Sequence, residues 1–351
     1  MTKNLRLALL AATVISSPAL GQRIENDFTI SNFRFASGES LPSLRIHYTT
    51  LGKPSRDAKG IVRNAVLMLH GTVGSGTALA APMSPLFARG ELLDTTKYYV
   101  ILPDGIGHGK SSKPSDGMHM KFPKYTYDDM VDAEHRLLED GLGVKHLHLL
   151  MGTSMGCMHG WLWGERYQGF VDGIVALACA PSPIVGRNRM IRKLIIDNIE
   201  RDPEWKGGEY TTEPQGLRGA MGDLFVMTSA PLLQLKQAPT RAVADSFVIA
   251  YMDARAKIND ANDVIYAFEA SRDYDPSAKL ETITTPILAI NSADDFVNPP
   301  ELGLVEQLIP RAPHARYVLI PISDKTRGHG THSVPAVWHD YLAEFLRSLP
   351  N

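Results

Sequence analysis

The feature that most constrains this chain is an apolar run followed directly by a serine between two glycines. Leu147–Met151 has the composition of a buried strand, and Gly152-Thr153-Ser154-Met155-Gly156 comes immediately after it. Glycine at both ends of the pentapeptide permits a sharp bend where a side chain would clash. Apolar and aromatic residues at helical spacing then begin at Cys157. The order predicts a strand, a tight turn that raises the Ser154 hydroxyl above a sheet edge, and a helix. This geometry is typical of a serine nucleophile for covalent acyl transfer.

Short apolar runs recur along the chain and alternate with helical patterns. The first two alternate in polarity like an antiparallel hairpin, and the later ones are continuously apolar like parallel strands covered on both faces. The expected strands are Phe28–Phe35, Leu44–Leu51, Ala65–His70, Tyr98–Leu102, His146–Met151, Ile174–Cys179, Ile287–Ile290 and Arg316–Ile322. The expected helices between them are Tyr127–Glu139, Met155–Tyr167, Pro300–Leu308 and Ala336–Leu349. This alternation predicts an α/β fold with a doubly wound, mostly parallel, eight-stranded sheet.

One stretch breaks the alternation of strands and helices. Residues 181–276 contain no convincing strand. The helix-like segments in this stretch are Met190–Ile199, Leu217–Thr228, Pro231–Leu235 and Arg241–Ala256. We therefore expect residues 181–276 to form a helical lid, inserted between late strands of a core made of residues 22–180 and 277–351. Sheets of this class bind ligands beyond the carboxyl ends of their strands, so a lid at that edge would roof the binding crevice.

The N-terminus has the features of a secretory signal peptide. Lys3 and Arg6 precede the apolar stretch Leu7–Ile15, and small residues follow it. We expect residues 1–21 to be removed, leaving a mature chain from Gln22 in the periplasm or secreted from the cell. The apolar stretch is too short to span a membrane comfortably, so no stable membrane anchor is expected. A net charge of −2 gives no electrostatic case for nucleic acid as a partner.

The chain contains two cysteines, Cys157 and Cys179. Both lie near the ends of expected neighbouring strands, so a bridge between them is possible. The preferred interpretation is a pair of buried free thiols, because a domain of this size does not need a disulfide even after export. No residues have zinc-ligand spacing, and the sequence predicts neither a metal nor a cofactor.

A serine nucleophile needs a base, and the base needs an orienting carboxylate. When the chain order is serine, acid, histidine, the acid follows a late strand and the histidine follows the last one. Asp294 and Asp295 lie on the turn after the expected strand Ile287–Ile290, and His329 and His332 lie after the last strand. We interpret Asp295 as the orienting acid, with Asp294 as the alternative. We interpret His329 as the base, with His332 as the alternative or as a residue that only lines the pocket.

The oxyanion of an acyl-transfer intermediate needs hydrogen-bond donors. The N–H of Met155, directly after the nucleophile, is one expected donor. The other should come from the loop after an early strand, where Thr72 follows Gly71. Each such donor contributes roughly 3 kcal/mol of transition-state stabilisation.

Several of these motifs together resemble the α/β-hydrolase superfamily, over nearly all of the mature chain. They are His70-Gly71-Thr72, Asp104 with Gly107, Gly109 and Ser111, the serine turn, and Gly328-His329. A closer resemblance is to the homoserine O-acetyltransferase branch, carried by Phe122–Val131, Ser154–Gly156 and Asp202–Tyr210. In that branch the catalytic triad corresponds by resemblance to Ser154, Asp295 and His329. Members of the branch often pair through their lids, which implies a possible homodimer.

The chain also departs from that branch. Thr153 and Cys157 stand where the branch usually has glycines around Ser-Met-Gly, and the loop Asp104–Gly109 has the ordinary hydrolase form. An acetyltransferase needs acetyl-CoA, which is scarce outside the cytoplasm. The prediction is therefore an exported serine hydrolase that forms an acyl-Ser154 intermediate from a small-molecule ester and passes the acyl group to water. An O-acyltransferase with the same triad is the alternative, and a non-catalytic binding protein on a hydrolase scaffold is the second alternative.

Overall fold

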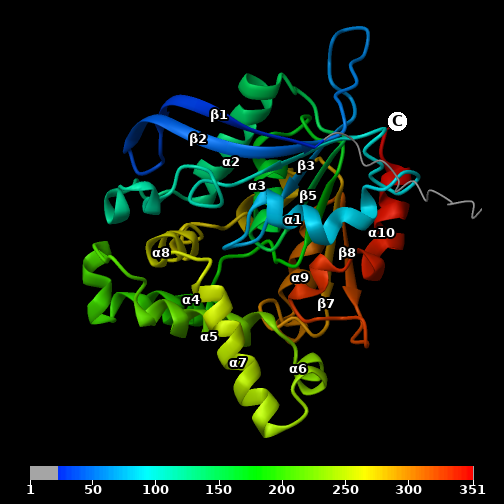
Figure 1. Cartoon of the computed structure of the whole chain (residues 1–351). Helices are drawn as coiled ribbons and strands as arrows, with labels where there is room; N and C mark the ends of the chain where they lie inside the picture. Colours follow the sequence, from blue (N-terminus) through cyan, green and yellow to red (C-terminus); the bar gives the residue numbers. More distant parts are fainter. Residues whose placement is uncertain (1–22, 351) are drawn as a thin grey trace, which may run out of the picture.

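An eight-stranded sheet forms the centre of the molecule (Figure 1). The computed structural model describes residues 23–350, so the expected signal peptide at residues 1–21 lies outside the described residues. The strands are β1 (Arg23–Arg34), β2 (Ser40–Leu51), β3 (Ala65–Leu69), β4 (Tyr99–Pro103), β5 (Leu149–Thr153), β6 (Ile174–Leu177), β7 (Ile287–Ser292) and β8 (Ala315–Ile320). They lie in the order β1-β2-β4-β3-β5-β6-β7-β8. β1, β2 and β4 pair antiparallel and the remaining pairs are parallel, which confirms the predicted fold class.

The interior strands are buried on both faces, as their continuous apolar runs predict. In β3, Ala65, Leu67 and Leu69 belong to one apolar cluster. Val66 and Met68 belong to another. Successive side chains of a strand point to opposite faces, so these clusters are the two halves of the core on either side of the sheet.

Helices cover both faces of the sheet (Figure 1). α2 (Tyr127–Arg136), α3 (Met155–Arg166) and α9 (Leu304–Leu308) contribute to the first cluster. α1 (Gly76–Met83) and α10 (Pro335–Ser348) contribute to the second. The helix expected over Pro300–Leu308 is interrupted, because Gly303 takes a left-handed conformation (φ 61°) between a 3₁₀ turn and α9.

Five further helices lie between β6 and β7 in the chain and gather at one edge of the sheet (Figure 1). They are α4 (Gly186–Glu200), α5 (Gln215–Thr228), α6 (Pro231–Gln237), α7 (Arg241–Ala256) and α8 (Ala261–Glu269). α4, α5 and α8 share an apolar cluster of their own. α7 has no buried residue, and α6 and α7 extend furthest from the sheet. The expected lid thus corresponds to a helical unit; its boundaries and its role in pairing two chains remain predictions.

Short helical turns complete the described chain. The 3₁₀ helices are Ser84–Leu86, Pro114–Asp116, His119–Lys121, Pro203–Gly208, Ser277–Thr282, Pro300–Leu302, Ile309–Arg311 and Gly330–Ser333, and a π-helical turn at Leu137–Gly141 continues α2. Within residues 23–350, no helix is both long and apolar enough to cross a membrane.

The interpretation of the two cysteines as free thiols is wrong. Cys157 and Cys179 form a disulfide, with their Cα atoms 5.9 Å apart. β6 ends at Leu177, earlier than expected, because Ala178 turns into the left-handed region (φ 65°). This turn brings Cys179 against the first turn of α3, and two buried thiols at such a distance can be bridged.

Candidate active site

Ser154 lies in a strained turn between β5 and α3, as the sequence predicts. Its backbone has φ 54° and ψ −109°, a conformation that is unfavourable for a residue with a side chain. The turn is held by two backbone hydrogen bonds, from Ser154 N–H to Leu177 O (2.8 Å) and from Gly156 N–H to His70 O (3.0 Å). A Cβ atom at Gly152 would lie 1.9 Å from the carbonyl oxygen of Gly156. Glycine is therefore required at this position.

A continuous hydrogen-bond chain joins Ser154, His329 and Asp295. His329 Nε2 lies 2.8 Å from Ser154 Oγ, and His329 Nδ1 lies 2.9 Å from Asp295 Oδ2. A carboxylate can only accept, so Nδ1 carries a proton and Nε2 is left to accept from the serine hydroxyl. The structure thus brings together three residues that are far apart in sequence, in the geometry that a base-activated serine requires.

Asp295 is the aspartate that contacts His329. Its Oδ1 accepts hydrogen bonds from the N–H groups of Val297 (2.7 Å) and Asn298 (3.3 Å), and its Oδ2 accepts one from Asn298 Nδ2 (3.2 Å). Burial raises the pKa of Asp295, but the charge and hydrogen bond of His329 and these N–H donors outweigh burial and hold it below its ordinary value. Asp294, the alternative, instead accepts a hydrogen bond from Ser292 Oγ at the end of β7.

His332, the alternative base, lies beside the chain and not in it. Its ring centroid is 5.3 Å from that of His329, and its Nδ1 is 2.9 Å from Ser333 Oγ. Burial and the proximity of His329 lower the pKa of His332 to about 3. An imidazole with so low a pKa is a weak base at neutral pH. Both the position and the pKa of His332 therefore favour His329 as the base.

The two expected oxyanion donors, Met155 and Thr72, lie in the segments that follow Ser154 and β3, and their role stays a prediction. Met155 is the first residue of α3, where N–H groups have no partner within the helix. Thr72 lies in a turn closed by a hydrogen bond from Gly74 N–H to Gly71 O (3.0 Å), in which Val73 has a left-handed φ of 54°. Valine is strained in that conformation, and strain of this kind is concentrated at functional sites.

The His70 side chain is hydrogen-bonded to the loop that contains Thr72. Its Nδ1 lies 2.8 Å from Gly71 O and its Nε2 accepts a hydrogen bond from Gly105 N–H (3.0 Å). Nδ1 must therefore be the protonated nitrogen, and the ring is neutral. Burial lowers the pKa of His70, which agrees with this tautomer. This supporting role of His70 was not predicted from the sequence.

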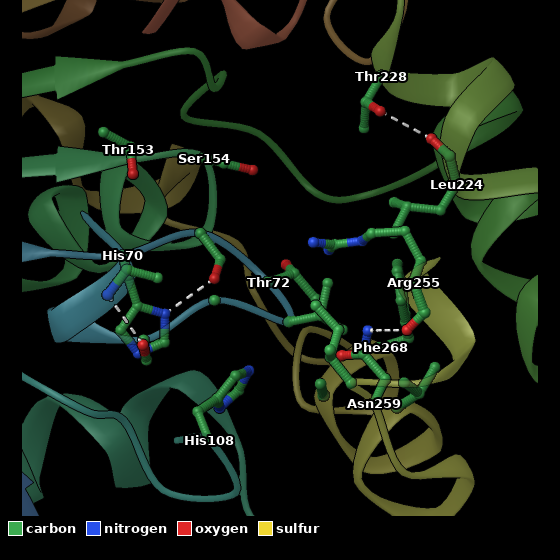
Figure 2. Close-up of a pocket in the computed structure, with 18 of the residues that line it drawn as sticks. His70, Thr72, His108, Thr153, Ser154, Leu224, Thr228, Arg255, Asn259 and Phe268 are labelled. Atoms are coloured by element: carbon green, nitrogen blue, oxygen red, sulfur yellow. Dashed lines mark hydrogen bonds between the residues drawn. The ribbon is translucent and has the colours of Figure 1, made fainter. Parts of the chain in front are cut away.

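Ser154 and His329 line one cavity of about 860 Å³, to which the core and the lid both contribute. Figure 2 shows Ser154 on one side of this cavity and the lid residues Leu224 and Arg255 on the other. This volume is within the range of ~300–1,000 Å³ that small-molecule sites occupy. The core contributes Thr72, His108 and His332 to the wall. Lid residues that line it include Arg192, Leu224, Met227, Tyr251, Arg255 and Phe268. None of these lid residues was predicted from the sequence, because nothing local indicates which face of a lid helix meets the core.

Comparison with known proteins gives a family model and several relatives. The model described as alpha/beta hydrolase fold matches residues 64–322. A probable acyltransferase from Methanothermobacter thermautotrophicus is 29% identical over 288 residues, which cover 81% of this chain and 88% of that protein. A homoserine O-acetyltransferase from Haloarcula marismortui is 27% identical over 314 residues, which cover 76% of this chain and 75% of that protein.

A solved structure adds a protein of a different activity. The crystal structure of esterase E22 covers 93% of this chain and 100% of its own, with a TM-score of 0.81 and 18% sequence identity. At that identity the likeness shows the shared fold alone. This fold therefore occurs in a protein described as an esterase, whereas the two sequence relatives are described as acyltransferases.

Proposed function

Because this chain belongs to the α/β-hydrolase family and resembles its homoserine O-acetyltransferase branch, we propose that it is an exported serine hydrolase that cleaves a small-molecule ester. The observation that carries the proposal is the hydrogen-bond chain from Asp295 through His329 to Ser154 at the wall of a small-molecule cavity. A binding protein would need neither this series of hydrogen bonds nor the strained backbone at Ser154. The non-catalytic alternative is therefore not favoured.

The proposed reaction has two steps. In the first, Ser154 Oγ attacks the ester carbonyl while His329 Nε2 takes its proton, and Asp295 stabilises the imidazolium. The N–H groups of Met155 and Thr72 hold the oxyanion. The intermediate then collapses, and the leaving alcohol takes the proton from His329. In the second step His329 activates water, which attacks the acyl-Ser154 carbonyl and releases the carboxylic acid and the free serine.

Two observations support an exported enzyme. The sequence of residues 1–21 has the pattern of a signal peptide. The Cys157–Cys179 disulfide is of a kind that persists in oxidising compartments and is rare in the cytosol. In such a compartment water is the abundant acyl acceptor and acyl-CoA is scarce.

An O-acyltransferase is the second candidate, favoured by the names of the sequence relatives. It uses the same acyl-Ser154 intermediate but passes the acyl group to an alcohol. The mature protein from Gln22 onward separates the two when it is incubated with acetyl-CoA and homoserine, and in parallel with a series of esters of graded acyl length. We expect ester hydrolysis and no substantial O-acetylhomoserine. Accumulation of O-acetylhomoserine would reverse the assignment.

The nucleophile is tested by covalent labelling with a fluorophosphonate probe. Ser154→Ala should abolish both labelling and ester hydrolysis. Ser31→Ala, at an exposed position of β1, is the matched control and should retain both. Labelling that persists in Ser154→Ala would show that another residue is the nucleophile, and wild-type protein that is not labelled would favour a binding function.

A further inference from the structure

Arg255 extends from the end of α7 into the cavity, and no acidic residue within 23–350 forms an ion pair with its guanidinium. Figure 2 shows the side chain reaching from the lid toward the side of the cavity where Thr72 and Ser154 lie. Its Nε is buried and has no hydrogen-bond partner among the described residues. The backbone is fixed by a hydrogen bond from Asn259 Nδ2 to Arg255 O (2.7 Å). A buried N–H donor without a partner costs free energy, so a ligand group that accepts from it would be bound favourably.

A second arginine lines the same cavity, and it forms no ion pair with an acidic residue in the part of the chain that the structure describes. Arg192 on α4 is only 2% exposed. Its hydrogen-bond partners are both neutral, Asn188 Oδ1 at 2.9 Å and Ser271 Oγ at 3.1 Å, and its guanidinium lies 5.4 Å from the centre of the Phe268 ring. Buried charges in proteins are ordinarily paired. Arg192 therefore adds a positive potential to the cavity that no described carboxylate cancels by direct contact.

The two aspartates that line the cavity already accept hydrogen bonds from the protein. Asp263 accepts hydrogen bonds from Ser115 N–H (2.9 Å) and Ser115 Oγ (2.7 Å) and lies 3.4 Å from Lys113 Nζ. Burial, and then the charge of Asp260, raise the pKa of Asp263 to about 6. Asp260 accepts from Asp263 N–H at the start of α8. Among the described residues, four cationic side chains and two carboxylates line the cavity, so the net charge of this lining is positive.

We propose that the substrate is an ester that carries a free carboxylate away from the scissile bond, and that Arg255 is the residue that selects it. This inference rests on the proposed ester hydrolysis at Ser154. A guanidinium presents parallel N–H donors that match the two oxygens of a carboxylate. Tyr251 precedes Arg255 by one helical turn and lines the cavity on the same helix face. Leu224 and Phe268 supply apolar wall for the carbon chain between the two functional groups.

The carboxylate can belong to the acyl part or to the alcohol part of the ester, and paired substrates distinguish these sources. For the acyl part, 4-nitrophenyl monoadipate is compared with its neutral methyl ester. For the alcohol part, 4-acetoxybenzoate is compared with methyl 4-acetoxybenzoate. Within each pair only the charge differs substantially. We expect the wild type to prefer the acid over its methyl ester in one pair by about 10-fold or more in kcat/KM, as a hydrogen bond to a charged group implies.

Three variants test whether Arg255 causes that preference for the acid. In Arg255→Met the acid-to-ester ratio should fall by about 10-fold. Arg255→Lys, which keeps the charge and loses the planar fork, should give an intermediate ratio. Arg241→Met removes the same charge from an exposed position at the other end of α7 and should leave the ratio as in the wild type. A wild type without preference for the acid in either pair overturns the proposal. An acid-to-ester ratio in Arg255→Met equal to that of the wild type overturns it as well.

Calorimetry separates failure of this inference from failure of the proposed function. Monomethyl adipate should bind Ser154→Ala, which has no nucleophile to cleave it, more tightly than dimethyl adipate does, and the difference should be lost when Arg255→Met is added. If no ester is hydrolysed but this Arg255-dependent binding is observed, the carboxylate site stands and the hydrolase assignment is wrong. If esters are hydrolysed but neither acid of the two substrate pairs is preferred and monomethyl adipate binds no more tightly than dimethyl adipate, the hydrolase assignment stands and the carboxylate site is wrong.

Discussion

The Cys157–Cys179 disulfide makes a quantitative prediction about stability. The two cysteines are 22 residues apart, and they join the first turn of α3 to the segment after β6. Closing a loop of that length in the unfolded chain removes conformational entropy worth about 3 kcal/mol at 25 °C. Both side chains are buried, at 0% and 3% exposure, so their neighbours hold them in place in the folded state as well. Replacement of both cysteines by alanine should therefore lower the free energy of unfolding by about 3 kcal/mol.

The same loss can be expressed as a melting temperature. For large domains each kcal/mol corresponds to roughly 2–4 °C, so the melting temperature should fall by about 6–12 °C. Ester hydrolysis at 25 °C should be largely retained. The turn at Ser154 is also held by hydrogen bonds to Leu177 O and from Gly156 N–H to His70 O. The disulfide is thus expected to stabilise the fold more than the chemistry.

The assay is urea unfolding followed by the fluorescence of tryptophan, since Trp161 and Trp163 are buried on α3. The double variant is compared with the oxidised wild type, and both are repeated with a reductant. Reductant should lower the midpoint of the wild type to near that of the variant and leave the variant unchanged. An oxidised wild type and a variant with the same midpoint and slope would refute the loop-entropy argument. A wild type that is fully alkylated in denaturant without reductant would show that the bond does not form.

Two further predictions concern carboxyl groups. Asp295→Asn should lower kcat for ester hydrolysis by roughly 10³–10⁴-fold, because an amide cannot hold His329 in the tautomer that accepts from Ser154. Asp294→Asn, which changes only the partner of Ser292, should lower it by far less, and the reverse ranking would reassign the acid. Burial and the charge of Asp260 raise the pKa of Glu213 from 4.5 to about 7. The folded chain then holds this proton more tightly than the unfolded chain, so stability falls as pH rises from about 4.5 to about 7. Glu213→Gln should consequently raise the melting temperature relative to the wild type at pH 8 and not at pH 4.5, whereas Glu200→Gln at an exposed position of α4 should do neither. A melting temperature of Glu213→Gln equal to that of the wild type at pH 8 would contradict the argument.

Much of the fold could be predicted because its signals are local. Continuous apolar runs indicate strands covered on both faces, and β3 and β5 are buried along their whole length. The lid was harder. α8 was not predicted, although Asp260 caps its N-terminus. The helix spans only nine residues, so its apolar residues repeat over too few turns to show a helical period. α7 was predicted by periodicity, but it has no buried residue, so periodicity did not reveal that Arg255 faces the cavity.

The sequence by itself determined the turn at Ser154 and the chain order of serine, aspartate and histidine. Both depend on short-range sterics and on apolar periodicity, which neighbouring residues encode. Only the tertiary structure decided which aspartate contacts His329, that the cysteines pair, and that two lid arginines share a cavity with Ser154. Ser154 and His329 are 175 residues apart. Contacts of that kind depend on how the strands are ordered in the sheet and how the lid docks on it, and these arrangements arise from packing that no single segment of the chain encodes.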